Sequence, residues 1–221
     1  PSKEGLKDMV PERKLAELGQ YNTFIGVNDR NIFQLDPRVA KTGLGQVKTY
    51  ATNPGFNQVT TTTEGCYAIG SEDGALRLYQ NEVKGNASNR YPGLGDPVRH
   101  LETTKDGRWL LATYDHYLIL LPTFTEDDVN LYQKKTNLNK RPVPRKLQIK
   151  IEHLSLCKVS DKWRMLPASF DESKDKQEKF IVSGFDQFVV IWSLSKLMKG
   201  DTTYTVSFLA NTVCENQRTS D

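Results

Sequence analysis

Short runs of β-branched, aromatic and leucine residues recur along the chain in pairs, and a polar turn containing an aspartate separates the members of each pair. The turn aspartates are Asp29, Asp73, Asp115 and Asp186. Such paired runs are typical of β-hairpins, and aspartate favours the turn because its carboxylate accepts hydrogen bonds from nearby backbone amides. A residue that recurs in every unit serves the repeated structure, so we assign these four carboxylates to turn formation and not to catalysis.

The spacing of the turns indicates an internal repeat. Successive turn aspartates are separated by 44, 42 and 71 residues. A period near 40 to 45 residues with several strands per unit is typical of propeller blades. The third interval exceeds one period, and the surplus falls in two segments that look inserted, 122–150 and 171–179.

We therefore predict an all-β chain built as one β-propeller domain with about four blade units. The expected units are 1–52 with an N-terminal lead-in, 53–96, 97–150 with a basic inserted loop at 122–150, and 151–221 with a C-terminal tail. Four blades are the lower limit of closed propellers. A closed ring of four blades is possible, but we favour an open arc from a larger propeller, because both termini look cut.

Composition and charge narrow the function classes. The net charge is only +3, which makes neither nucleic acid nor membrane binding the default. Three widely spaced cysteines provide no disulfide framework and favour a reducing, cytoplasmic setting. No apolar run is long enough for a membrane helix and no secretory signal is evident, although the chain begins with proline and reads as a fragment. We expect no metal or cofactor, because the histidine spacing fits no ligand motif and no glycine-rich phosphate loop is present.

One segment is a candidate binding site. Seven cations and no acid lie between residues 129 and 151. The candidate partner-binding residues are Lys134, Lys135, Lys140, Arg141, Arg145 and Lys146, with Lys150 completing the seven. They could hold an acidic protein partner, an acidic lipid surface or RNA, although a single aromatic residue in the loop gives base stacking little support. The alternative is a solvated loop whose charge is balanced by the acids at 126–128.

Several segments resemble one known family in the same order. They are Phe33-Gln34-Leu35-Asp36-Pro37-Arg38, Thr63-Glu64-Gly65, Asp73-Gly74-Ala75-Leu76-Arg77-Leu78-Tyr79, Leu94-Gly95-Asp96-Pro97, Asp106-Gly107-Arg108-Trp109-Leu110-Leu111-Ala112-Thr113, Pro144-Arg145-Lys146-Leu147-Gln148 and the run at 189–200. Over residues 10 to 210 the chain resembles the C-terminal WD40-like propeller of the vacuolar import and degradation protein 27 family. The resemblance implies a cytoplasmic, non-enzymatic propeller linked to delivery of proteins to the vacuole for degradation. It supplies no catalytic residue, and the longer N-terminal region of the family is absent here.

The fourth unit also resembles an ordinary WD repeat. Ser183, Asp186 and Trp192 stand where that repeat places its structural serine, turn aspartate and strand tryptophan, and His153 is in range for its histidine. The resemblance implies a buried hydrogen-bond network with a role in stability. The other three units lack the tryptophan and are degenerate in this respect.

Two function classes remain besides the basic-loop binder. The first is a scaffold that presents loops to unidentified protein partners, without integral membrane insertion. The second is a hydrolase with carboxylates and histidines converging on the central channel. An enzyme of this kind would need charged side chains on the innermost strands, and we expect those strands to be apolar.

Overall fold

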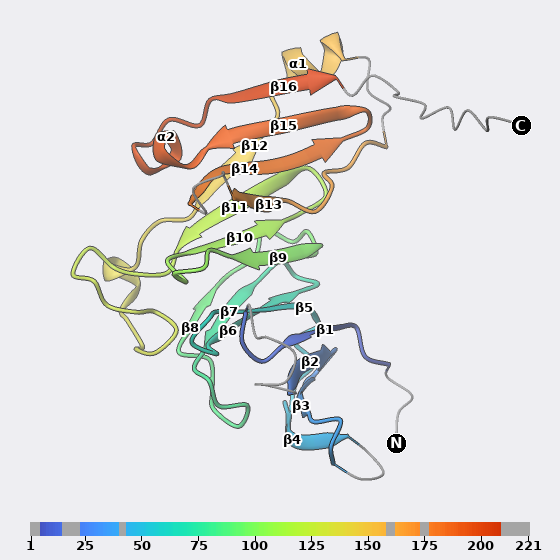
Figure 1. Cartoon of the computed structure of the whole chain (residues 1–221), viewed down its shortest axis with the longest axis vertical. Coiled ribbons are helices and arrows are strands. Elements are labelled where there is room, and N and C mark those ends of the chain that lie inside the picture. The colour runs from blue at the N-terminus through green and yellow to red at the C-terminus, as the bar shows by residue number, and fades with distance from the viewer. Residues whose placement is uncertain (1–4, 15–22, 40–42, 158–161, 173–176, 209–221) are drawn as a thin grey trace, which may run out of the picture.

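The computed structural model describes residues 5–14, 23–39, 43–157, 162–172 and 177–208. These residues form four antiparallel sheets of four strands each, and every sheet is made of consecutive strands (Figure 1). We number the sheets 1 to 4 in chain order. The first strands of adjacent sheets contact one another, so they form the inner side of the assembly.

The strands have the following bounds. Sheets 1 and 2 contain β1 (Asp8–Pro11), β2 (Phe24–Asn28), β3 (Asn31–Leu35), β4 (Leu44–Thr49), β5 (Phe56–Thr61), β6 (Tyr67–Ser71), β7 (Leu76–Tyr79) and β8 (Asn89–Tyr91). Sheets 3 and 4 contain β9 (His100–Thr103), β10 (Trp109–Thr113), β11 (Tyr117–Pro122), β12 (Arg145–Gln148), β13 (Ser169–Glu172), β14 (Glu178–Phe185), β15 (Phe188–Ser193) and β16 (Tyr204–Phe208).

Helices are short and lie outside the sheets. They are the 3-10 turn η1 (Leu138–Lys140) and the helices α1 (Ile151–Leu156) and α2 (Leu194–Met198). None of the helices in the described part of the chain is long and apolar enough to cross a bilayer. The all-β class is therefore confirmed.

The core consists of three layers, each filled by two facing sheets. Strand β10 shows the principle, because Leu110 and Ala112 belong to the cluster shared with sheet 2, whereas Leu111 belongs to the cluster shared with sheet 4. Side chains alternate between the two faces of a strand, so a strand between two sheets must be apolar on both. This explains the continuous apolar runs in the sequence.

Equivalent turns and contacts repeat from sheet to sheet. Gly65 and Gly107 occupy the turns between the first and second strands of sheets 2 and 3, with φ values of +87° and +67° that favour glycine. Near these turns, the Thr61 hydroxyl donates to the Pro11 carbonyl at 2.9 Å, and the Thr103 hydroxyl donates to the Thr61 carbonyl at 2.9 Å. Two hydrogen bonds of the same kind therefore join the inner strands of sheets 1, 2 and 3.

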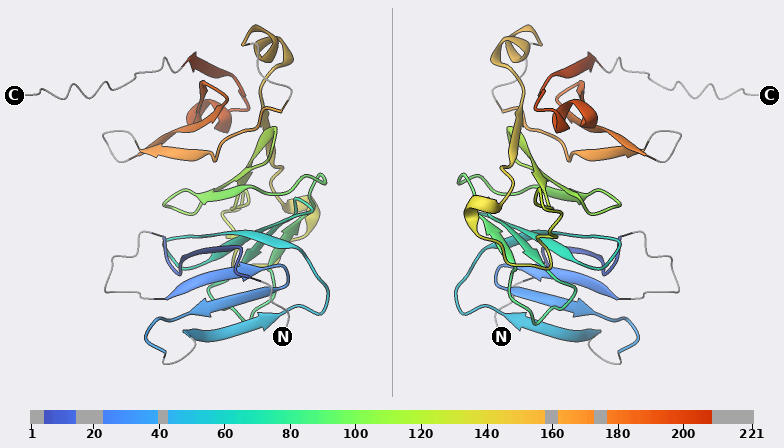
Figure 2. Two further views of the ribbon diagram at one scale, coloured as in Figure 1. Left: turned by 90° about the vertical axis from the view of Figure 1, so that its right-hand side faces the viewer. Right: turned by 90° about the vertical axis from the view of Figure 1, so that its left-hand side faces the viewer.

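The four sheets form an open arc. Figure 1 shows sheet 1 at one end of the molecule and sheet 4 at the other, and Figure 2 shows the sheets stacked between these ends. The outer faces of the end sheets carry partly exposed apolar side chains, including Met9 and Val47 on sheet 1 and Phe180 on sheet 4. The expected open arrangement of blade-like units is confirmed.

Candidate functional site

The four turn aspartates occupy one equivalent position, between the second and third strands of each sheet. Asp29 follows β2, Asp73 follows β6, Asp115 follows β10 and Asp186 follows β14. In sheets 1 and 3 a cation that precedes the first strand pairs with this carboxylate, Lys7 with Asp29 at 2.6 Å and Arg99 with Asp115 at 2.9 Å. Hydrogen bonds from Arg99 hold the pKa of Asp115 below its ordinary value. Through these ion pairs, each carboxylate lies beside the start of the first strand of its own sheet.

Sheets 2 and 4 use the same turn position differently. The Asp73 carboxylate accepts a hydrogen bond from the backbone amide of Ala75 at 3.1 Å, and Arg90 lies 3.4 Å from it. Asp186 has a φ of +50°, which aspartate tolerates better than most residues. In both sheets the aspartate accommodates a tight turn.

The hydrogen-bond network expected for the WD-like fourth unit does not form among the residues that the structure describes. Ser183 donates to the Leu166 carbonyl at 2.8 Å, and the buried Trp192 Nε1 has no hydrogen-bond partner in the described part of the chain. His153 lies on α1, where its Nδ1 is 2.7 Å from the Tyr204 hydroxyl on the outer strand. The prediction was wrong because α1 places the histidine against the outer strand, where its ring contacts Tyr204, while the Ser183 hydroxyl bonds to Leu166.

The expectation of apolar innermost strands is also wrong. The apolar runs are the second and third strands, whereas the first strands carry polar side chains such as Asp8, His100 and Glu102. Asp8 Oδ2 accepts a hydrogen bond from the Val59 amide at 2.8 Å, and Lys14 lies 3.5 Å from Glu102. Asp8 thus joins sheet 1 to sheet 2, and Lys14, which follows β1, reaches across to sheet 3. No group of three metal-ligating side chains occurs among the residues that the structure describes.

The predicted basic loop is a folded insertion between β11 and β12, which we call the insertion (residues 123–144). It belongs to sheet 3 but packs on sheet 2, since Leu131 and Tyr132 are buried in the cluster that the two sheets share. The Tyr132 side chain is only 1% exposed. The insertion is therefore anchored by its middle and leaves an arm on either side.

Asn89 on β8 provides the polar part of this anchor. Its Nδ2 donates to the carbonyls of Leu131 at 2.6 Å and Lys134 at 2.8 Å, and its Oδ1 accepts from the Thr136 amide at 3.1 Å. The residue is 2% exposed, so these bonds are shielded from water. One buried amide thus fixes the start of the basic segment. No local pattern in the sequence marks this role, because the contacts span more than 40 residues.

Three of the six predicted partner-binding cations are used within the fold. Arg141 donates to the carbonyls of Thr136 and Arg90 at 2.8 and 2.9 Å. Arg145 donates to the Met198 carbonyl at 3.1 Å, which ties β12 to α2. Lys146 places its amine 4.3 Å from the centre of the Tyr117 ring. These side chains hold the insertion and the outer strand in place.

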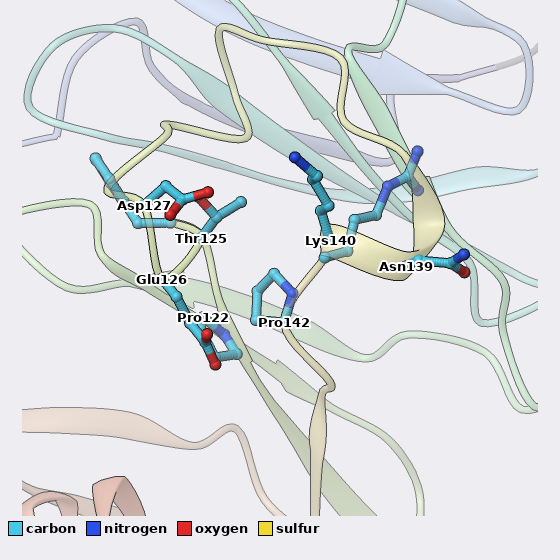
Figure 3. Close-up of a pocket in the computed structure, with 9 residues that line it drawn as sticks. Pro122, Thr125, Glu126, Asp127, Asn139, Lys140 and Pro142 are labelled. Carbon is cyan, nitrogen blue, oxygen red and sulfur yellow. The ribbon is translucent and has the colours of Figure 1, made fainter.

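The three remaining predicted cations line cavities in the surface. Lys134, Lys135 and Lys140 are exposed and lie on what we call the basic arm (residues 134–142). Two adjoining cavities of about 450 and 320 Å³ separate this arm from the acidic arm (residues 123–129). Both cavities are lined by Thr125, Asp127 and Lys140, and Figure 3 shows Lys140 across the larger cavity from Thr125 and Asp127. We call this space the cleft.

The acids before the loop do not neutralise these lysines by direct pairing. Asp128 pairs with Arg108 at 2.9 Å, and Arg108 in turn lies 4.5 Å from the centre of the Phe124 ring. Glu126 and Asp127 are exposed on the acidic arm. No ion pair joins the three lysines to a carboxylate within the described ranges. The cleft therefore presents amines that are available to an anionic ligand.

Four-stranded blade-like sheets, consecutive in sequence and packed face to face in an arc, define this chain as a WD40-like β-propeller protein. Residues 2–219 match the family described as the VID27 C-terminal WD40-like domain, and the chain belongs to this family.

Two relatives are similar over most of the chain. Vacuolar import and degradation protein 27 of Schizosaccharomyces pombe is 30% identical over 205 residues, which cover 89% of this chain and 26% of that protein. Vacuolar import and degradation protein 27 of Saccharomyces cerevisiae is 28% identical over 200 residues, covering 86% of this chain and 25% of that protein. The chain thus spans about a quarter of the length of these curated relatives.

Proposed function

We propose that this chain is a non-enzymatic, cytoplasmic interaction module that serves vacuolar import and degradation of cytosolic proteins. The family and the names of its relatives support the process. The equivalent placement of the turn aspartates supports a structural role for the acids that could otherwise be candidates for catalysis. The sheets then act as a rigid frame that presents loops to partners.

We place partner binding at the cleft. Three exposed lysines border the cavities, and the buried Asn89 amide anchors the segment that bears them. An acidic segment of a protein partner fits this arrangement, because its carboxylates can form charge-assisted hydrogen bonds with the amines. Lys134, Lys135 and Lys140 are the residues that bind it.

A peptide-binding experiment tests this function. The probe is a fluorescent peptide rich in aspartate and glutamate, titrated with the chain at several salt concentrations. The variant K134Q/K135Q/K140Q is expected to weaken binding at least about tenfold, since each charged hydrogen bond contributes about 1.5–3 kcal/mol. The control K84Q/K196Q/K199Q removes three exposed lysines elsewhere and keeps the affinity of the parent.

Two outcomes would overturn acidic-peptide binding at the cleft. One is equal affinity of the parent and the cleft variant. The other is preferential binding to RNA or to vesicles of acidic lipid, with the steep salt dependence of phosphate contacts. Vacuolar turnover of a cytosolic reporter tests the cellular role. Cells in which the cleft variant replaces the parent sequence should degrade the reporter more slowly, while the control variant should not change its degradation.

A further inference from the structure

The hydroxyl of Thr125 is placed where a phosphate would reach the basic arm. Thr125 lines both cavities of the cleft, together with Lys140. Lys134 and Lys135 line the smaller cavity as well. A phosphate on this hydroxyl would add a charge of about −1.5 to −2 in a space lined by three lysines and by the acids Glu126 and Asp127.

The sequence around Thr125 suits a kinase that recognises acidic substrates. Thr125 is followed at once by Glu126, Asp127 and Asp128, and all three acids are exposed. The hydroxyl lies in a short surface turn, where it accepts a hydrogen bond from the Val129 amide at 3.1 Å. Thr125 itself is half-buried, but the turn that it begins is exposed, and exposed turns are the parts of a fold that open most readily to enzymes.

Ser71 provides an internal contrast. It is also followed by two acids, Glu72 and Asp73, but its side chain is buried at the end of β6 with 0% exposure. A guanidinium nitrogen of Arg77 donates to its hydroxyl. The acidic pattern alone therefore does not make a hydroxyl accessible, and the two sites differ in their structural setting.

We propose that Thr125 is a phosphorylation site and that its phosphate occupies the cleft by pairing with Lys134, Lys135 and Lys140. In the modifying step, Thr125 Oγ1 attacks the γ-phosphorus of ATP held by an acid-directed protein kinase. The bond from this phosphorus to the β–γ bridging oxygen breaks, ADP leaves, and the hydroxyl proton passes to a base of the kinase. The phosphorylated chain then carries its own anion at the position of the acidic partner.

This inference rests on the proposed function in one respect, because the same three lysines receive the partner. Phosphorylation converts them from a binding surface into an internal ion-pair cluster. A partner and a phosphate that compete for the same amines exclude each other, so phosphorylation switches the module off. The affinity for the acidic peptide should fall by about five- to hundredfold, the usual range for coupled sites.

The first experiment locates the modification. The full chain is incubated with an acid-directed serine/threonine kinase and ATP, and phosphopeptides are mapped by mass spectrometry. Phosphate is expected on Thr125 and not on Ser71, and T125A should lose that signal. An unmodified Thr125 would overturn the proposal.

The second experiment shows where the phosphate lies. Phosphorus NMR follows the second ionisation of phospho-Thr125, which has a pKa of about 6 when no cation is near. Lysine contacts should lower it in the folded chain, and the shift should disappear in K134Q/K135Q/K140Q but persist in K84Q/K196Q/K199Q. An unshifted phosphate in the parent would overturn the pairing.

The third experiment measures the switch. Peptide affinity is compared before and after kinase treatment for the parent and for T125A, and only the parent should weaken. Equal affinity of the parent before and after modification would overturn the switch. Failure of the unmodified parent to bind the peptide would instead refute the proposed function, and the NMR readout would still decide where the phosphate lies.

Discussion

The two middle sheets and the two end sheets use the same kind of strand but bury it to different extents. On β6 of sheet 2 every side chain is buried, whereas on β15 of sheet 4 buried and half-buried positions alternate. The half-buried positions of β15 include Val189 and Ile191, which are as apolar as their buried neighbours. The strands of a blade are therefore apolar on both faces whether or not both faces are covered. The position of the sheet in the arc decides how much of this apolar surface is buried.

The largest expected effect tests this difference directly. Leu110→Ala in sheet 3 removes a side chain with 0% exposure and should lower the free energy of unfolding by about 2–5 kcal/mol. Leu35→Ala in sheet 1 removes a half-buried side chain from the open face and should cost about 1 kcal/mol. Urea unfolding followed by circular dichroism measures both. Equal losses would show that the open face of sheet 1 is covered in solution.

The second effect concerns the anchor between sheet 2 and the insertion. Asn89→Ala leaves two carbonyls and one amide of the insertion without their buried partner and should cost about 1–3 kcal/mol. Asn53→Ala is the control, since Asn53 is exposed and makes one local hydrogen bond to the Gly55 amide at 2.9 Å. Hydrogen exchange should also show faster exchange of the Thr136 amide in the Asn89 variant. A stable Asn89 variant with unchanged exchange would contradict the anchoring role.

The third effect depends on pH and concerns the turn of sheet 3. Because Arg99 holds the pKa of Asp115 below its ordinary value, this pair stabilises the fold fully above the unfolded pKa of about 3.9. That contribution disappears as the pH falls through the lower folded pKa. Asp115→Asn should therefore be less stable than the parent at pH 7, and the two unfolding curves should converge on acidification below pH 4. A difference that stays constant between pH 7 and pH 2.5 would contradict the ion pair.

The smallest expected effect is a difference in stability between variants of two buried tyrosines, both in the cluster that sheets 2 and 3 share. The Tyr132 hydroxyl is buried without a hydrogen-bond partner in the described part of the chain, so Tyr132→Phe should change stability by less than about 0.5 kcal/mol or increase it. The Tyr114 hydroxyl donates to the Gly74 carbonyl at 2.8 Å, and Tyr114→Phe should cost about 1 kcal/mol. Thermal unfolding of the two variants should give this order, and the reverse order would contradict it.

The sequence predicted the sheets better than it predicted the contacts between them. The apolar runs and the turn aspartates mark the second and third strands, because alternation and turn chemistry are local properties. The first and fourth strands are harder to predict because their sequences are partly polar, as in the six-residue β4 and β5, and because some are as short as the three-residue β8.

The charge of the sequence predicted where the candidate site lies, but it did not predict which of the cations line that site. The run of cations identified the insertion, yet Arg141 and Arg145 bind carbonyls of other segments and so also serve the fold. The expected network of Ser183 and Trp192 failed for the same reason, since Leu166 takes the serine hydroxyl. Long-range hydrogen bonds of this kind leave no periodic signal in the chain.

The insertion also has a consequence for the order in which parts of the molecule open. It begins and ends in sheet 3, but its buried middle is fastened to β8 of sheet 2. Neither of these sheets can separate from the other without extracting Tyr132 and breaking the Asn89 bonds. The central half of the arc should therefore unfold as a single cooperative unit. The end sheets are joined to it by hydrogen bonds such as those of Asp8 and Arg145, but by no buried insertion in the described ranges, so they should open before it.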